Sequence, residues 1–514
     1  MRVGIYNRWL ATLGGGEKYD LTIAECLSHH HQVEVLSHQR VDKAYAAERL
    51  QVDLSRVEFV ILPNRSALEM TPVTQEYDFF INGSYLDFFP SLAPRSAAVV
   101  FFPANLGPNT FSRRWLKTFM RQQLHLPQVL ISPQAYNLAK GGLDWVADTD
   151  LKLRLPAERK SYPLEFYLRA CHPAVTGAHL YLNGIAIEQI NLSRAAHCRV
   201  LIPCLLEKKY HELVISPVVS DEPGEGEALL AIKNFSLGLW PYRFYQRLLE
   251  KNLHRLGVRL EYSPPGVAIL DYLDTYTAIW SISEYTTKWI WRYWKRDSSI
   301  LYPPVNVESY TGGEKRPQIL NVGRFFAGNH NKKHSVMVEA FKRMVDQGLT
   351  GWTLHLAGGT TSGEEHKAYL DNIIEQSDHY PITIHPDIPF PELAELYSTS
   401  AVYWHASGFG EDDQREPEKY EHFGITTVEA MAAGCVPVVI AKGGQPEIVQ
   451  HGKNGFLWNT LEELQQSTLQ LMQDSALASS LSQQAVQDSR QYATDAFCRR
   501  VNQLIAGNDE IDPS

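Results

Sequence analysis

Residues 2–37 read RVGIYNRWLATLGGGEKYDLTIAECLSHHHQVEVLS. The order of the elements predicted in this segment indicates the fold class. The apolar run at Arg2–Tyr6 predicts a strand, and the glycines at 14–16 predict a turn. A helix over about Glu17–Ser28 and a strand over Gln32–Ser37 complete the unit. Strand, helix and strand in this order build a parallel sheet. With further apolar runs at 57–62, 79–82 and 97–101, the sequence predicts a doubly wound α/β domain.

Around residue 150 the pattern changes to short strand-like segments without helices between them. Asn183-Gly184 lies between two of these segments and predicts a hairpin, because a tight two-residue turn needs positive φ at both positions. A helix near 242–256 and a strand at 277–282 then return to the α/β pattern. We therefore expect residues 150–236 to form a β-rich, sandwich-like module inserted into the first domain.

A second alternation of strands and helices runs from Ile319 to about Leu457, and residues 461–505 are predicted to be helical. This pattern predicts a second doubly wound domain. Two such domains place their ligand sites outside the carboxyl ends of the strands, so we expect the chemistry in a cleft between them.

Composition narrows the class of protein. The chain has 514 residues with a formal charge of −10, which disfavours non-specific attraction to nucleic acid. Six scattered cysteines without CxxC spacing predict reduced thiols in a reducing compartment. No apolar run approaches the ~20 residues of a membrane span, and the first residues read as a strand and not as a signal peptide. We expect a cytoplasmic protein, with contact at the inner face of a membrane left open.

The segment 421–437, EHFGITTVEAMAAGCVP, carries the strongest chemical signal. It places Glu421 in a loop and Glu429 inside a helix that starts near Ile425, just after Gly424. Two carboxylates flanking a helix start can accept hydrogen bonds from sugar or ribose hydroxyls. The backbone N–H groups between them, at Gly424, Ile425 and Thr426, favour an anion.

Several motifs in order resemble the family 4 glycosyltransferases, which are retaining enzymes of the GT-B fold. The chain matches them outside 150–236 at these places: Gly14–Glu17, Ser281–Thr286, Leu301–Val305, Val322–Phe325, Lys332, Leu356–Gly359, Glu421–Glu429 and Gly443–Val449. The resemblance implies two Rossmann-like domains, with residues 1–149 and 237–312 on the acceptor side and 313–490 binding the donor. It also implies that residues 491–514 cross back to the first domain.

The family also implies roles for individual residues. Arg324 and Lys332 would hold the diphosphate of a nucleotide sugar and stabilise the charge that develops as it leaves, so that no metal or other cofactor is required. Lys333 could exchange roles with Lys332. Glu421 would lie by the donor sugar and Glu429 would bind the ribose. Gly15, Gly16, His405 and Glu447 are further candidate donor contacts, with a structural histidine and a helix cap as the alternatives for the last two.

The implied reaction is transfer of a hexose, with retention, to a hydroxyl of a saccharide or a lipid-linked acceptor. One departure stands against it, since many family members have a histidine where this chain has Phe101. A binding protein without turnover therefore remains the alternative, and an epimerase of the same fold is a weaker one.

Two aromatic and basic segments have open interpretations. Residues 111–121 predict either contact with a membrane or lipid-linked acceptor, or a packed helix face with solvated arginines. Residues 288–295 have the same character, and their family match favours packing in the core.

Overall fold

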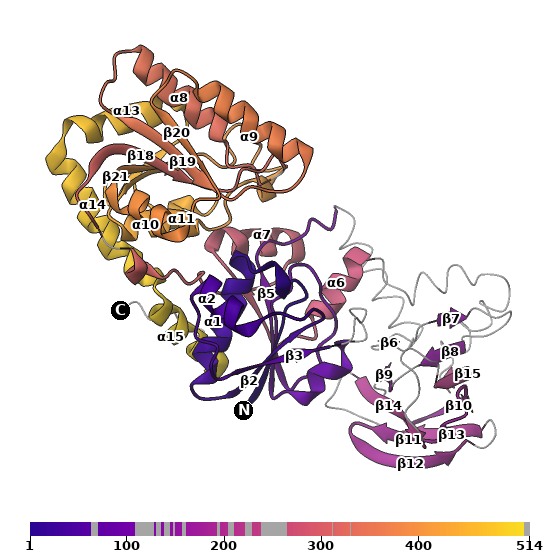
Figure 1. The fold of residues 1–514 in the computed structure, drawn as a ribbon. Coiled ribbons are helices and arrows are strands. Elements are labelled where there is room, and N and C mark those ends of the chain that lie inside the picture. Colours follow the sequence, from indigo (N-terminus) through magenta and orange to yellow (C-terminus); the bar gives the residue numbers. More distant parts are fainter. Residues whose placement is uncertain are drawn as a thin grey trace.

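The computed structural model contains two α/β domains and a separate β-rich module (Figure 1). It describes residues 1–62, 70–107, 128–129, 135–137, 144–147, 150–156, 161–192, 196–203, 210–220, 229–237, 265–310, 312–328 and 330–507. The predicted helix near 242–256 and the basic, aromatic segment 111–121 lie outside these residues. Among the described helices, none combines the length and the apolar character needed to cross a bilayer.

The first domain is built on a seven-stranded parallel sheet with the order β17-β16-β5-β4-β1-β2-β3. The predicted strands lie within two residues of the observed ones. The elements are β1 (Arg2–Tyr6), α1 (Gly15–Ser28), β2 (Gln32–Ser37), α2 (Lys43–Leu50), β3 (Val57–Ile61), β4 (Phe79–Asn82), β5 (Arg95–Val100), α6 (Pro265–Leu273), β16 (Ala278–Ser281), α7 (Glu284–Trp294) and β17 (Ser299–Ile300).

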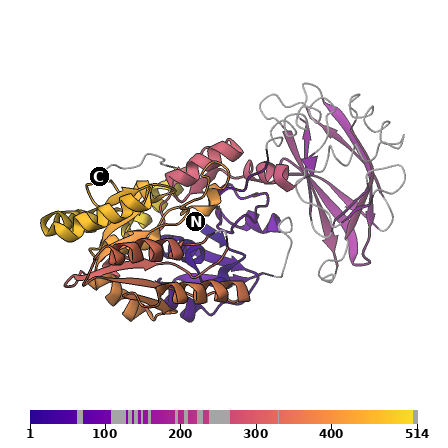
Figure 2. The same cartoon turned by 90° about the horizontal axis from the view of Figure 1, so that it is seen from above.

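The inserted module consists of two five-stranded antiparallel sheets, ordered β13-β10-β15-β8-β7 and β12-β11-β14-β9-β6. Figure 2 shows it at one end of the molecule, beyond the first domain. Its strands begin at residue 128, earlier in the chain than residue 150. They are β6 (Gln128–Val129), β7 (Ala135–Asn137), β8 (Asp144–Ala147), β9 (Leu151–Pro156), β10 (Tyr162–Ala170), β11 (Val175–Leu182), β12 (Ile185–Asn191), β13 (Ala196–Ile202), β14 (Tyr210–Val219) and β15 (Leu230–Leu237).

Strand alternation explains why the module folds as a sandwich. Along β10, Leu164, Phe166 and Leu168 are fully buried, whereas Tyr167 is 45% exposed on the outer face. The predicted hairpin is confirmed, since Asn183 and Gly184 join β11 to β12 with φ of 52° and 80°.

The second domain has a six-stranded parallel sheet with the order β20-β19-β18-β21-β22-β23. The alternation predicted from Ile319 onward is confirmed. The elements are β18 (Arg316–Val322), α8 (His334–Asp346), β19 (Thr353–Gly358), α9 (Glu364–Ser377), β20 (Ile382–Pro386), α10 (Phe390–Thr399), β21 (Ser400–His405), α11 (Ile425–Ala432), β22 (Val436–Ile440), α12 (Gln445–Ile448), β23 (Phe456–Trp458), α13 (Leu461–Gln473), α14 (Ser475–Ser489) and α15 (Thr494–Ala506).

The final helix, α15, returns to the first domain and packs on α1 (Figure 1). The rings of Tyr19 and Phe497 meet at 5.3 Å, and the Arg95 guanidinium donates to the carbonyl oxygen of Ile505. Just before α15, the backbone N–H of Val305 donates to the carbonyl oxygen of Tyr492 at 2.8 Å. The two segments that connect the domains therefore run side by side.

A disulfide joins Cys26 of α1 to Cys498 of α15, so the prediction that the cysteines are all reduced is wrong. The two positions are 472 residues apart, and spacing along the chain could not reveal that the last helix returns to the first. Cys171, Cys198 and Cys435 are free thiols.

The aromatic segment 288–295 forms most of α7, at the junction of the two α/β domains (Figure 1). Trp289 and Trp294 are buried, as core packing predicts, but Trp291 is 53% exposed. A helix with apolar residues on more than one side can bury only the side that faces the core.

Candidate active site

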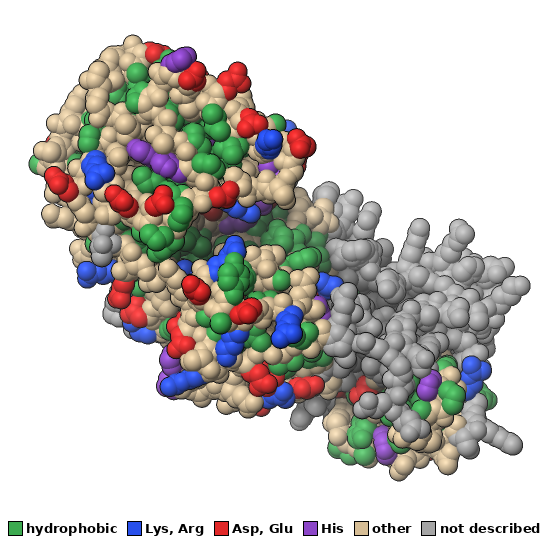
Figure 3. Space-filling model, in the orientation of Figure 1, with side chains coloured by type: hydrophobic (Ala, Val, Ile, Leu, Met, Phe, Trp, Pro, Cys, Tyr) green, Lys and Arg blue, Asp and Glu red, His purple; other side chains and the backbone are tan. Residues whose placement is uncertain are grey.

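A cleft of about 750 Å³ separates the two α/β domains (Figure 3). It lies at the carboxyl ends of the strands of both sheets, as the doubly wound architecture predicts. The first domain contributes Gly15, Gly16, Tyr19, Phe101, Ile282 and Pro303. The second domain contributes Val322, Gly323, Arg324, Lys332, Gly358, Gly359, Asp387, Ile388, Leu393, Glu421, His422, Phe423, Gly424, Ile425 and Thr426.

The first domain presents the N-terminus of α1 to the cleft. Gly14 precedes the helix, and the carboxylate of Glu17 accepts a hydrogen bond from the Gly14 N–H at 2.8 Å. A Cβ built on Gly15 would meet no atom within 4 Å and would extend into open space, so the glycine leaves room for a ligand to approach the backbone. The free N–H groups of the first turn favour an anion there.

The second domain presents the N-terminus of α11 to the same cleft. Gly424 adopts φ of 127°, which other residues rarely adopt, and the turn aims the first N–H groups of α11, those of Ile425 and Thr426, at the cleft. The Tyr403 hydroxyl donates to the Thr426 Oγ1 at 2.7 Å and fixes that side chain. Gly424, Ile425 and Thr426 thus lie together, as the sequence predicts.

Arg324 and Lys332 both line the cleft and follow β18. Within the described parts of the chain, Arg324 has no carboxylate partner, and its guanidinium lies 5.7 Å from the ring centroid of Phe326. Lys333 points away and pairs with Glu411 at 2.5 Å. The structure therefore favours Lys332 over Lys333 as the second cleft cation.

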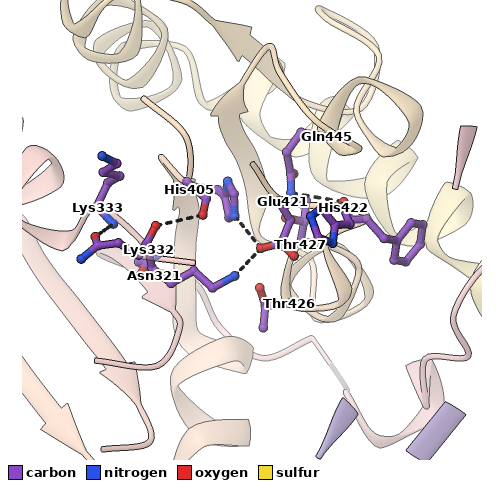
Figure 4. Close-up of polar contacts among 12 residues, drawn as sticks. Asn321, Lys332, Lys333, His405, Glu421, His422, Thr426, Thr427 and Gln445 are labelled. Atoms are coloured by element: carbon purple, nitrogen blue, oxygen red, sulfur yellow. Dashed lines mark hydrogen bonds and ion pairs between the residues drawn. The ribbon is translucent and has the colours of Figure 1, made fainter. Parts of the chain in front are cut away.

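Glu421 lies at the centre of a small charged cluster. The Lys332 ammonium pairs with its Oε2 atom, and the His405 Nε2 lies 3.3 Å from the same oxygen (Figure 4). Burial alone would raise the pKa of Glu421, but the charge of Lys332 and the His405 hydrogen bond outweigh burial and hold it well below its usual range. Glu421 is therefore ionised and faces the cleft.

His405 itself is 2% exposed and does not line the cleft. Burial lowers its pKa, so the imidazole is neutral, and Nε2 carries the proton because a carboxylate only accepts. His405 therefore contacts Glu421 from the side away from the cleft.

Glu429 is held within the domain interface, one turn along α11 from the cleft-lining Ile425. The Tyr397 hydroxyl donates to its Oε2 at 2.8 Å, and the Tyr310 side chain lies close enough to act on the pKa of Glu429. The charge of Lys18, on α1 of the other domain, also acts on Glu429. Burial nevertheless raises the pKa of Glu429 above its ordinary value.

The structure shows the helix-cap role for Glu447, at a different helix from the one that the sequence indicated. Its two carboxylate oxygens accept hydrogen bonds from the backbone N–H groups of Glu284 and Tyr285, both at 2.7 Å. These groups begin α7 of the first domain, so Glu447 caps a helix across the interface and not its own helix.

Several site residues escaped the sequence reasoning. Tyr310 and Tyr397 carry no motif of their own, and only the fold brings them to Glu429. Ile388 and Leu393 line the cleft after β20, where the carboxyl end of a predicted strand was an available signal. Asp387 accepts hydrogen bonds from the Thr360 N–H and hydroxyl at 2.8 and 2.6 Å.

Among the described residues, no group of three His, Cys, Asp or Glu side chains is arranged to hold a metal.

Residues 306–488 match the family described as Glycosyl transferases group 1. Two relatives support this match. One, from Dictyostelium discoideum, is named GDP-Man:Man(3)GlcNAc(2)-PP-Dol alpha-1,2-mannosyltransferase and is 28% identical over 193 residues, covering 33% of this chain and 35% of the relative. Human alpha-1,3/1,6-mannosyltransferase ALG2 is 26% identical over 179 residues, covering 31% and 40%. The chain thus spans about two fifths or less of the length of these two relatives.

Solved structures confirm the GT-B fold. Anabaena Alr3699/HepE in complex with UDP and glucose aligns over 98% of this chain and 99% of its own, with a TM-score of 0.52 and 11% identity. A glycosyltransferase from Rickettsia africae aligns over 99% of both chains, with a TM-score of 0.53 and 11% identity.

Proposed function

We propose that this chain transfers a hexose from a nucleotide sugar to an acceptor hydroxyl, because residues 306–488 match the group 1 glycosyl transferases. The acceptor is a saccharide or a lipid-linked acceptor, and the anomeric configuration is retained. The proposal rests on one observation: the N-termini of α1 and α11, the cations Arg324 and Lys332 and the ionised Glu421 all line one cleft.

The diphosphate of the donor fits between the N-termini of α1 and α11, near Arg324 and Lys332. Phosphate oxygens accept hydrogen bonds from the free N–H groups of both helices. The two cations neutralise the charge that grows as the nucleoside diphosphate leaves, so that this site needs no metal for that task. Lys332 is paired with Glu421 before the donor binds, and it can be shared between that carboxylate and a phosphate.

In the proposed reaction, the bond between the sugar C1 and the phosphate oxygen breaks, and a bond from C1 to the acceptor oxygen forms on the same face. The proton of the acceptor hydroxyl passes to the departing phosphate oxygen. Glu421 accepts hydrogen bonds from the sugar and orients it, with His405 and Lys332 fixing the carboxylate.

The residues that the first domain contributes to the cleft favour the departing phosphate, and not a side chain, as the base that accepts the proton of the acceptor hydroxyl. Phe101 lines the cleft where many family members have histidine, and the Tyr19 hydroxyl is occupied as a donor to the Leu301 carbonyl. The same observation supports the second candidate, a protein that binds nucleotide sugars without turnover. Release of nucleoside diphosphate in the presence of an acceptor separates the two candidates.

Thermal denaturation with a panel of GDP-, UDP- and ADP-sugars tests the proposal first. GDP-mannose and UDP-glucose are included because one relative is named for GDP-Man and one structural neighbour was solved with UDP and glucose. A sugar nucleotide at ~100 times its Kd adds roughly 2.7 kcal/mol of stability. Stabilisation by one nucleotide that is weakened in Glu429→Ala supports the proposal, and no stabilisation by any of them contradicts it.

A further inference from the structure

Three buried tyrosines form a row beneath α11, which we call the tyrosine row: Tyr310, Tyr397 and Tyr403. Tyr397 and Tyr403 are fully buried and Tyr310 is 9% exposed. The rings of Tyr310 and Tyr397 meet at 5.2 Å, and those of Tyr397 and Tyr403 stack at 6.5 Å. Tyr310 lies in the segment before β18, Tyr397 in α10 and Tyr403 in β21, so only the fold brings them together.

All three hydroxyl groups act on one face of α11. Tyr397 donates to the Glu429 Oε2 at 2.8 Å, and Tyr403 donates to the Thr426 Oγ1 at 2.7 Å. The Tyr310 side chain lies against Tyr397 and acts on the pKa of Glu429. Thr426 and Glu429 are three residues apart, so they lie on the same side of the helix. Thr426 lines the cleft, so this face of α11 is turned toward it, with Glu429 one turn further along the helix.

Tyr397 is itself held in place from behind. The Lys315 ammonium donates to its carbonyl oxygen at 3.3 Å and to that of Ser398 at 2.9 Å. The Cys435 thiol donates to the same Tyr397 oxygen at 3.1 Å. These contacts hold the backbone at the end of α10, from which the buried Tyr397 side chain reaches Glu429.

We propose that Tyr397 and Tyr310 are positioning residues that aim the Glu429 carboxylate at the vicinal hydroxyl groups of the donor's ribose. With Oε2 engaged by Tyr397, the remaining lone pairs of Glu429 are left to accept from the ribose hydroxyls. The tyrosine row then determines selectivity for ribonucleotides over nucleotides that lack the diol. This inference rests on the proposed function and deepens it.

The charges around Glu429 agree with this role. Burial raises the pKa of Glu429, while the hydrogen bond from Tyr397, the nearby Tyr310 hydroxyl and the charge of Lys18 lower it. An ionised carboxylate is the better acceptor for two hydroxyl groups. Loss of one tyrosine hydroxyl should therefore weaken the diol contact and also make it more dependent on pH.

The test is titration calorimetry of the full chain with UDP, GDP and ADP, each beside its 2′,3′-dideoxy counterpart. The measured quantity is the ratio of the two Kd values for the base that binds best. A charge-assisted hydrogen bond of ordinary strength predicts a ratio of about tenfold or more in the wild type. In Tyr397→Phe we expect the ratio to fall at least about threefold, with dideoxynucleotide affinity unchanged. We also expect the affinity of Tyr397→Phe for the ribonucleotide to increase more between pH 6 and pH 8 than that of the wild type.

Tyr380→Phe is the matched control, because Tyr380 donates to Asp346 at 3.0 Å on an exposed part of the same domain. It should leave the ratio unchanged. Tyr310→Phe provides a second variant should Tyr397→Phe fail to fold. If Tyr397→Phe and Tyr310→Phe discriminate between ribonucleotides and dideoxynucleotides as well as the wild type does, this inference is overturned and the proposed function is not. A wild type that binds none of the three nucleotides overturns the proposed function, and the inference with it.

Discussion

Glu447 of the second domain accepts a hydrogen bond from the backbone N–H of Tyr285 in the first domain at 2.7 Å. Its other carboxylate oxygen accepts from the neighbouring N–H of Glu284, so one side chain holds the first turn of α7 from across the interface. The Tyr285 hydroxyl returns a hydrogen bond to the Pro417 carbonyl at 2.9 Å. These contacts join the two domains beside the cleft in the observed orientation.

Replacing Glu447 by glutamine should flatten the pH dependence of stability. Burial raises the pKa of Glu447 to about 7, against 4.5 for the free side chain. The folded state therefore keeps this proton to higher pH than the unfolded state. The stability that it contributes is fully present below pH 4.5 and is lost as pH rises through 7. Chemical denaturation between pH 4.5 and 8 should show wild-type stability falling relative to Glu447→Gln by about 1–3 kcal/mol. Parallel profiles would contradict this prediction.

Lys332→Ala should reduce turnover by about 10²–10³-fold, because it removes a cation beside the leaving diphosphate and leaves the buried Glu421 without its counter-charge. Lys333→Ala is the matched control, since Lys333 is the next residue but pairs with Glu411 outside the cleft. Initial rates of nucleoside diphosphate release measure both variants. Equal losses in the two would show that the cleft cation has been misassigned.

Gly424→Ala should lower both donor affinity and melting temperature. Its φ of 127° strains any other residue, and the new Cβ would lie 2.4 Å from the Gln445 Nε2. Strain of this kind costs about 1–3 kcal/mol. Gly452→Ala is the control, because Gly452 also has positive φ, at 76°, but has open space around its Cβ position. A ligand-affinity loss confined to Gly424→Ala would show that the turn positions the α11 N-terminus.

Cys498→Ser should lower the melting temperature, because it releases α15 from α1 and reopens a very long loop in the unfolded chain. Native disulfides typically contribute about 2–4 kcal/mol. Dithiothreitol should destabilise the wild type by a similar amount and leave Cys498→Ser unaffected. Cys171→Ser, which alters a free thiol, is the control. A reducing agent that affects both proteins equally would contradict the pairing.

The sequence predicted the two sheets well because parallel strands are short apolar runs between helices and turns. It also placed Gly424, Glu421 and Glu429 on the correct elements, since the glycine marks the helix start. It could not place Glu447, because the partners of that carboxylate are backbone N–H groups 162 and 163 residues earlier in the chain. Tyr397, Tyr310 and the Cys26–Cys498 bond were missed for the same reason. Contacts between distant segments depend on how the domains pack and leave no local pattern.

The pairing of Val305 with Ala493 and Tyr492 has a consequence for motion. The chain passes between the α/β domains in these two segments, so the two connections meet at one place. A relative movement of the domains that preserves this pairing pivots there. We therefore expect the cleft to open and close about Val305 and Ala493, a motion that a pair of fluorophores placed across the cleft would follow.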